Sequence, residues 1–330
     1  MTHALRRTIG LGLGALVGLG LGLGQALAER WDMPMAYADG NYHTQNGKLF
    51  AKAVTQATDG KLEVVVHGGG SLFKGNDIKR AVQTGQAPIG ERLISALGNE
   101  NPLFEIDALP FLATSFKEAW TLYQATRPAL VKALDKQGLV FLYAVPWPPQ
   151  GLYTKGPVQS AADMAGKKFR AYNAATARLA ELMGAVPTQI EAAEIAQAFA
   201  TGVAESMISS GSTGYDRKLW EHTTHWYNIQ AWLPKNMVMA NKKAWDGLDS
   251  DTRAIIRGAA AMAEQAGWAK AEELSGWYAD QLAAHGMTVG PAGPQLKADF
   301  QKIGATMTKE WLAKAGADGQ AIIDTYESMK

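Results

Sequence analysis

The chain has 330 residues, 47% of them hydrophobic, with 32 Lys and Arg against 31 Asp and Glu and no cysteine. An almost neutral chain lacks the basic footprint of proteins that bind nucleic acids or anionic membranes. The absence of cysteine excludes disulfides, thiolate metal sites and cysteine nucleophiles, and it is compatible with an oxidising compartment outside the cytoplasm.

The N-terminus has the order of a secretory signal peptide. Arg6 and Arg7 precede an uncharged apolar run over residues 9–24, and small residues at 26 and 28 suit cleavage after Ala28. A retained membrane anchor is the alternative, but the run is shorter than the roughly 20 residues that span a bilayer. Without residues 1–28 the net charge of +1 falls by two arginines to −1. We therefore predict export to the periplasm.

Strand and helix patterns alternate through the first part of the remaining chain. Residues 62–67 form a short segment rich in β-branched side chains, which favours a strand. Residues 41–58 have apolar positions at helical spacing. Ser115 and Glu118 form a capping-box pattern that opens a helix. In this part of the chain the predicted strands are 31–37, 62–67, 87–92 and 139–145. The predicted helices are 41–58, 76–84 and the one that begins after Ser115. This βαβ rhythm predicts α/β lobes with mainly parallel sheets.

Three prolines within residues 146–151 interrupt this rhythm, because proline fixes φ and cannot donate a ladder hydrogen bond. We predict that the chain crosses here from a first lobe to a second and returns near residues 232–241. The second lobe repeats the pattern, and residues 188–191 are predicted to cap one of its helices. Further predicted elements are strands at 168–171, 204–209 and 237–240 and a helix at 174–183.

Residues 249–284 contain no proline and keep one apolar stripe, which predicts a helix of 36 residues, about 50 Å long. Two consecutive helices are the alternative, because Gly267 and Gly276 weaken the segment. A helix this long would reach across both lobes, and residues 295–330 are predicted to form C-terminal helices. The predicted parts are a signal peptide (1–28), a first lobe (29–146 plus about 237–265) and a second lobe (147–236 plus about 266–330).

Several motifs follow one another in the order found in one family of binding proteins. They are GSLFKG at 70–75, ALPF at 108–111, DMAGKKFRAYNAAT at 163–176, GAVPT at 184–188, ATGV at 200–203 and WLPKN at 232–236. With these motifs the chain after the signal peptide resembles the solute-binding proteins of tripartite ATP-independent periplasmic (TRAP) transporters, the DctP family. The resemblance implies two α/β lobes with a spine helix and a cleft that closes over an organic anion. It also implies delivery of that anion to the small and large TRAP membrane subunits for sodium-coupled uptake.

Arg170 is the principal candidate for binding a carboxylate. It ends a predicted strand, at the edge where open α/β sheets bind ligands, and a guanidinium can form a planar, bidentate pair with a carboxylate. A surface arginine or a structural ion pair is the alternative. The resemblance favours binding, because Arg170 matches the arginine that clamps the ligand carboxylate in the family. Asn173 can either contact the ligand or cap the next helix.

Glu91 and Arg92 end a second predicted strand and match an acid-containing cleft position of the family. Either Arg92 approaches the anion, or Glu91 only positions the arginines through an ion pair. Related proteins that bind larger sugar acids carry a second arginine near a position where this chain has Gln150. This difference favours a monocarboxylate with an apolar or ring-shaped body, such as an aromatic, hydroxy or oxo acid or pyroglutamate.

Other candidate binding residues lie at the predicted lobe crossings and strand ends. Aromatic residues can form walls of the cleft, with plain core packing as the alternative, and hydroxyl and amide groups can donate hydrogen bonds to the ligand. The aromatic candidates are Trp147, Tyr215, Trp226 and Trp232, and the others are Tyr37, His43, Ser209, Ser210 and Asn236.

No sequence pattern indicates catalysis or a cofactor. His222 and His225 beside Glu221 have metal-ligand spacing, but no third ligand is evident. The glycine-rich stretch at 68–71 lacks a Walker lysine, and no nucleophile elbow occurs. The sequence therefore predicts a binding protein without enzymatic activity, metal or cofactor. The alternatives are a ligand-sensing partner of a membrane receptor and an exported hydrolase.

Overall fold

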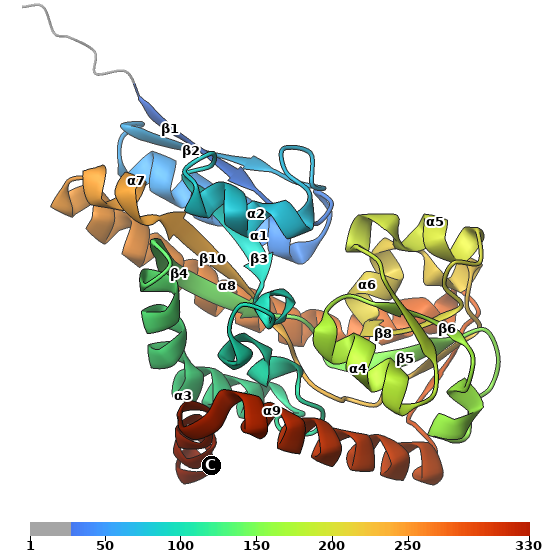
Figure 1. The fold of residues 1–330 in the computed structure, drawn as a ribbon. Helices are drawn as coiled ribbons and strands as arrows, with labels where there is room; N and C mark the ends of the chain where they lie inside the picture. Colours follow the sequence, from blue (N-terminus) through green and yellow to red (C-terminus); the bar gives the residue numbers. More distant parts are fainter. Residues whose placement is uncertain (1–27) are drawn as a thin grey trace, which may run out of the picture.

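Two α/β lobes make up the chain in the computed structural model, which describes residues 28–330 (Figure 1). The first lobe contains a parallel pair of strands and a three-stranded sheet in the order β3-β10-β4. Its strands are β1 (Glu29–Pro34), β2 (Leu62–His67), β3 (Ile89–Leu93), β4 (Leu139–Pro146) and β10 (Lys235–Asn241), and its helices are α1 (Tyr42–Ala57), α2 (Gly75–Gln83), α3 (Phe116–Asp135) and α7 (Lys242–Gly247). Except for Ala28, the predicted signal peptide lies outside the described residues.

The second lobe is built on a six-stranded sheet in the order β11-β9-β5-β8-β6-β7. Its strands are β5 (Gln150–Thr154), β6 (Lys168–Ala171), β7 (Val186–Gln189), β8 (Ser206–Ser210), β9 (His225–Tyr227) and β11 (Thr288–Gly290), and its helices are α4 (Ala174–Leu182), α5 (Ile195–Ala200) and α6 (Gly211–Asp216). The predicted two-lobed α/β fold is confirmed. The predicted helix cap at 188–191 is wrong, because this segment contains the end of β7.

Each lobe contains antiparallel as well as parallel strand pairs, whereas the sequence predicted mainly parallel sheets. In the first lobe β10 pairs antiparallel with β3 and β4, and in the second lobe β5 pairs antiparallel with β8 and β9. A parallel neighbour requires a crossover connection, usually a helix. The strands β5 and β10 instead enter their sheets directly from the opposite lobe, and this allows the antiparallel direction.

The chain crosses between the lobes close to the predicted places. The first crossing joins β4 to β5 through residues 147–149, and the second joins β9 to β10 through residues 228–234. The third is α8 (Ser250–Ala284), one continuous helix whose N-cap Asp249 accepts a hydrogen bond from the backbone of Thr252. This helix packs on α1 and β4 of the first lobe and on α6 and β11 of the second. The predicted spine helix is therefore present.

The C-terminal helix α9 (Pro294–Met329) runs beneath both lobes in Figure 1. It bends at Gly316, whose φ of 58° is readily adopted only by glycine. Before the bend Phe300 packs in a core cluster of the second lobe, whereas Ile322 and Tyr326 belong to a core cluster of the first lobe. The sequence analysis placed all of residues 266–330 in the second lobe. The end of α9 instead packs on the first lobe, since the bend sets its apolar side chains against α3.

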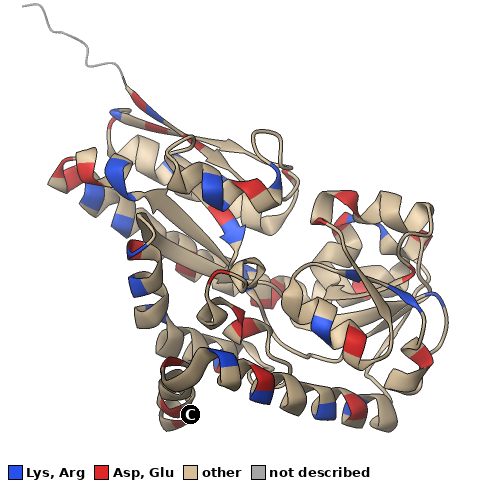
Figure 2. Ribbon diagram, in the orientation of Figure 1, with Lys and Arg blue, Asp and Glu red and all other residues tan. Residues whose placement is uncertain are grey.

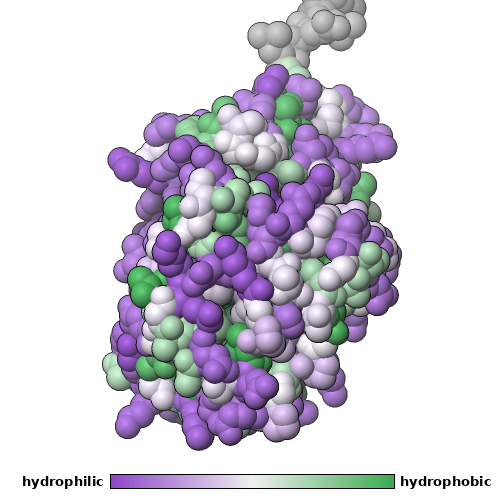
Figure 3. Space-filling view, turned by 90° about the vertical axis from the view of Figure 1, so that its right-hand side faces the viewer, coloured by the Kyte–Doolittle hydropathy of each residue, from purple (hydrophilic) through white to green (hydrophobic). Residues whose placement is uncertain are grey.

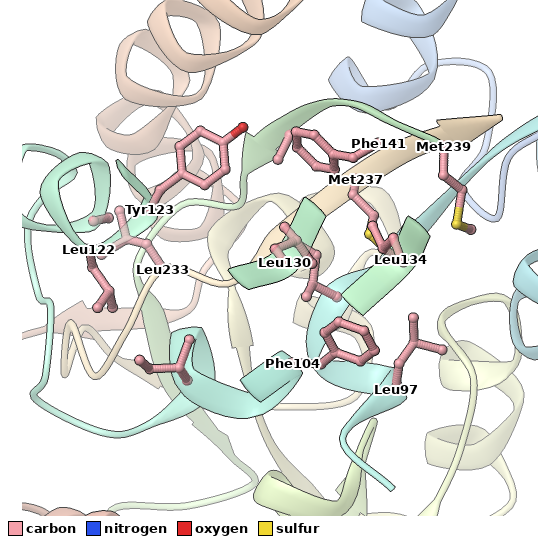
Figure 4. Packing of buried hydrophobic residues seen from close by; sticks show 14 of the residues in the cluster. Leu97, Phe104, Leu122, Tyr123, Leu130, Leu134, Phe141, Leu233, Met237 and Met239 are labelled. Atoms are coloured by element: carbon pink, nitrogen blue, oxygen red, sulfur yellow. The ribbon is translucent and has the colours of Figure 1, made fainter. Parts of the chain in front are cut away.

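Each lobe has its own hydrophobic core. Figure 4 shows one core of the first lobe, where Phe104 from a 3-10 turn, Leu130 of α3 and Met237 of β10 come together. Acidic and basic residues are interspersed over both lobes (Figure 2), and the face on the second lobe's side is mainly hydrophilic with scattered apolar residues (Figure 3). None of the helices within residues 28–330 combines the length and hydropathy that a membrane crossing requires.

Candidate functional site

A cavity lies between the lobes and is lined by residues of both. The first lobe contributes Tyr37 and Arg92, and the second contributes Arg170. Seven of the candidate residues named in the sequence analysis line this cavity: Tyr37, Arg92, Trp147, Gln150, Arg170, Ser209 and Ser210. The two crossing segments also reach it, because Trp147 and Gln150 flank the first crossing and Pro234 belongs to the second. The cavity is thus enclosed by residues of both lobes and of both crossings.

Arg170 lies near the end of β6 and is 3% exposed. Its Nε donates a hydrogen bond of 2.9 Å to the carbonyl oxygen of Ile190, and its guanidinium lies 5.2 Å from the centre of the Tyr172 ring. Burial lowers the pKa of Arg170 to about 10, so the side chain remains positively charged at neutral pH. Arg170 takes part in none of the ion pairs found within residues 28–330. A buried, unpaired charge is costly, and an anionic ligand would remove that cost.

Arg92 is the second guanidinium at the cavity and is 7% exposed. Its Nη2 donates to the side-chain oxygen of Asn76, and its buried Nε has no hydrogen-bond partner among the described residues. Burial lowers the pKa of Arg92, and the nearby carboxylate of Glu191 opposes this shift. Arg92 therefore has a free donor and only a partial counter-charge.

Trp147 is held against the cavity by a buried polar chain behind it. Its indole Nε1 donates to Oδ1 of Asn236 at 2.9 Å, and Nδ2 of Asn236 donates to Oε1 of Glu91 at 3.0 Å. The other oxygen of Glu91 lies 3.6 Å from Nδ1 of His43. The ring of His43 packs on that of Trp147 at a centroid distance of 4.2 Å, with an angle of 42° between the ring planes. Glu91 thus pairs with a histidine and not with an arginine. Glu91, Asn236 and His43 support the wall from behind.

We expect Asn236→Ala to lower the free energy of unfolding by about 2–3 kcal/mol, because it leaves Trp147 and Glu91 each without a buried hydrogen-bond partner. Urea unfolding followed by tryptophan fluorescence measures the loss. The matched control is Asn99→Ala in an exposed turn, for which a change within about 0.5 kcal/mol is expected. Equal stabilities of the two variants would contradict a supporting role for Asn236.

A second polar chain orients the floor of the cavity. Trp232 donates from Nε1 to the hydroxyl oxygen of Tyr172 at 3.1 Å, and that hydroxyl donates to Oε1 of Gln150 at 3.3 Å. The amide nitrogen of Gln150 donates to the carbonyl of Pro148. Trp232 is 1% exposed and lies behind Tyr172 instead of lining the cavity. Sequence reasoning missed Tyr172, although its spacing of two residues from Arg170 places both side chains on one face of the extended chain.

Three other candidates serve packing or capping in this structure. Asn173 caps α4 by accepting from the backbone of Thr176, and its amide nitrogen donates to Ser95 of the first lobe. Tyr215 packs edge-on against Trp277, and Trp226 is buried in a core cluster of the second lobe. None of the three lines the cavity.

Two serines follow one another at the end of β8. Ser209 and Ser210 both line the cavity, and Ser210 also caps α6 by accepting from the backbone of Thr213. Further cavity residues that the sequence analysis did not select are Asn76, Gln189, Ile190, Glu191 and Thr213. They lie in the first turns of helices, at the end of the edge strand β7 and in the two residues after it, so no apolar periodicity marks them.

Comparisons with known proteins agree with this geometry. A family model described as "Bacterial extracellular solute-binding protein, family 7" matches residues 35–315. A solved TRAP solute-binding protein from an unidentified marine microbe, specific for pyroglutamate and containing co-purified pyroglutamate, is 53% identical with a TM-score of 0.90, covering 91% of this chain and 99% of that one. DctP7, a solute receptor of Bordetella pertussis that binds pyroglutamic acid, is 49% identical with a TM-score of 0.90, covering 91% of this chain and 100% of that one.

A more distant relative is the C4-dicarboxylate-binding periplasmic protein DctP of Rhodobacter capsulatus. It is 28% identical over 230 residues, which are 67% of this chain and 66% of that protein. The chain thus matches just under two thirds of the length of this relative, whereas it matches almost all of the two solved structures.

Proposed function

Because the chain belongs to family 7 of the bacterial extracellular solute-binding proteins, the DctP proteins of TRAP transporters, we propose that it binds pyroglutamate in the periplasm and delivers it to TRAP membrane subunits. The ligand of the two similar solved structures supports this choice. In this role the protein holds the ligand without making or breaking a covalent bond. The proposal includes export by the N-terminal signal peptide and sodium-coupled uptake through the membrane subunits.

The charge of the cavity carries the proposal. Arg92, Arg170 and Glu191 are its only ionised lining residues within the described chain, and together they leave one net positive charge. A ligand with one carboxylate neutralises this charge, whereas a dicarboxylate would bring one negative charge too many into a buried site. Desolvating an uncompensated charge is unfavourable. Pyroglutamate has a single carboxylate and matches this count.

The shape and polarity of the cavity fit the rest of the molecule. Pyroglutamate is a small lactam ring with one amide N–H and one amide carbonyl. We place its carboxylate on the guanidinium of Arg170, where a bidentate pair is possible. The rings of Tyr37, Trp147 and Tyr172 can enclose the methylene groups. The free donor of Arg92 and the hydroxyl of Ser209 are available for the lactam.

We expect pyroglutamate to raise the melting temperature of the purified mature protein by several degrees, because a ligand at 100 times its Kd stabilises the folded state by about 2.7 kcal/mol. Isothermal titration calorimetry should give one site per chain. Succinate, glutarate and galacturonate are the comparison ligands, since they add a carboxylate or several hydroxyl groups. A dicarboxylate or a sugar acid that stabilises the protein more than pyroglutamate would overturn the ligand assignment.

A further inference from the structure

One carboxylate reaches across the boundary between the lobes beside the cavity. Glu191 follows β7 of the second lobe, and its two oxygens accept hydrogen bonds from backbone N–H groups at the start of α2 in the first lobe. Oε2 lies 3.1 Å from the nitrogen of Gly75, and Oε1 lies 3.0 Å from the nitrogen of Asn76. In Figure 1, α2 and the helices of the second lobe stand on opposite sides of this boundary.

The start of α2 needs such a partner. The first N–H groups of a helix have no acceptor within the helix, and a side chain at the N-cap usually satisfies one of them. Here the N-cap is Lys74, whose side chain makes no capping hydrogen bond. Glu191 therefore supplies the cap from the other lobe, and its negative charge also complements the positive end of the helix dipole.

Gly75 gives this carboxylate room to approach. A Cβ atom at position 75 would lie 3.0 Å from Oε2 of Glu191 and 2.9 Å from Nη1 of Arg92. Both distances are shorter than ordinary contacts of such an atom, so with a side chain at this position the ends of Glu191 and Arg92 would have to shift. The glycine is thus matched to a close approach of the two lobes.

The same segment connects the two arginines of the cavity. Arg170 donates to the carbonyl of Ile190, the residue directly before Glu191. On the other side, the Asn76 side chain accepts from Arg92, and the Asn76 backbone donates to Glu191. A hydrogen-bonded path therefore runs from one guanidinium to the other across the lobe boundary. A ligand that engages Arg170 and Arg92 would hold both ends of this path.

We propose that Glu191 is the latch of the closed form: by capping α2 from the second lobe it holds the lobes together and slows release of the ligand. It is a positioning residue, and this role rests on the proposed function as a binding protein that closes. Two other hydrogen bonds join the lobes, from Asn173 to Ser95 and from Asn41 to Asp216, and none of these four residues lines the cavity. A substitution at Glu191 removes none of the atoms of these two contacts, so the contribution of the latch can be tested separately.

The test compares Glu191→Ala with Glu194→Ala, a matched control that removes an exposed carboxylate three residues away. The chain has no cysteine, so exposed Lys52 of α1 and Gln197 of α5 can be replaced by cysteines and spin-labelled without background. Distances between the labels are measured by pulsed electron paramagnetic resonance, with and without saturating pyroglutamate. Stopped-flow fluorescence gives the association and dissociation rates.

We expect Glu191→Ala to shift the distances toward an open form in both conditions and to raise the dissociation rate about tenfold, which corresponds to about 1.4 kcal/mol. Because the substitution also removes the one negative charge of the cavity lining and thereby favours association of an anion, the distances without ligand, and not the rates alone, decide the latch. Glu191→Gln, which keeps one acceptor oxygen, should be intermediate, and Glu194→Ala should match the wild type.

Unchanged distances and rates in Glu191→Ala would overturn the latch while leaving pyroglutamate binding in place. A wild-type protein that does not bind pyroglutamate would overturn the ligand instead. In that case the distances without ligand still decide the latch, because every atom of the cap belongs to the chain itself: longer distances in Glu191→Ala support it, and equal distances refute it.

Discussion

Arg170→Ala should abolish measurable pyroglutamate binding, with a loss of at least about 100-fold in affinity. Removing one partner of a buried, hydrogen-bonded charge pair costs 2–5 kcal/mol or more, and each 1.4 kcal/mol is a factor of ten. Isothermal titration calorimetry measures the loss. The ligand-free protein should keep its melting temperature, because the substitution also removes a buried charge that has no counter-ion in the described chain. An unchanged melting temperature would show that the loss of affinity is a binding defect and not a folding defect.

Arg170→Lys distinguishes a planar clamp from a simple positive charge. Lysine keeps the charge but cannot form two parallel hydrogen bonds with a carboxylate, so we expect affinity between that of Arg170→Ala and the wild type. The control is Arg178→Ala on α4, which removes an exposed arginine paired with Glu310 and should leave binding unchanged. Wild-type affinity in Arg170→Ala would contradict the assignment of Arg170 to the ligand carboxylate.

Several strands and helix starts, including the strand that carries Arg170, could be predicted because their signals are local. The strand at 168–171 and the strand at 62–67 have the predicted bounds, and Ser115 and Asp249 cap the helices that follow them. Sheet direction could not be predicted in the same way. The strands β5 and β10 have antiparallel neighbours because the chain enters them from the opposite lobe. The residues of these strands carry no sequence signal for that direction.

Candidate binding residues could also be located where the signal is local, but not where their role depends on a contact between the lobes. Arg92, Trp147, Gln150 and Ser209 lie at strand ends or crossings, which sequence can locate, and the structure brings them to the cavity with Arg170. Glu191 was interpreted as part of a helix cap within its own lobe, whereas its carboxylate caps a helix of the other lobe. Such a role depends on the contact between lobes. Asn173 could be either a ligand contact or a cap, and its geometry here is that of a cap.

Removing one partner of a buried ion pair at the second crossing is expected to destabilise the ligand-free protein strongly. Oδ2 of Asp107 lies 3.3 Å from Nζ of Lys235 and also accepts from the backbone nitrogen of Lys235 at 2.9 Å. Both residues are almost fully buried, and Lys235 directly follows Pro234 of the cavity wall. Asp107→Ala leaves the ammonium group buried without its counter-ion. We expect a loss of about 3–5 kcal/mol, seen as a melting temperature lower by roughly 10 °C.

Two further variants separate the buried charge from the loss of an ion pair as such. Asp135→Ala breaks an exposed pair with Lys242 and should cost no more than about 1 kcal/mol. The double change Asp107→Leu with Lys235→Met removes both buried charges and should regain most of the stability lost by Asp107→Ala, because two apolar side chains need no mutual compensation. If Asp107→Ala were no less stable than Asp135→Ala, the crossing would be held by its hydrophobic neighbours Leu233 and Met237 and not by the ion pair.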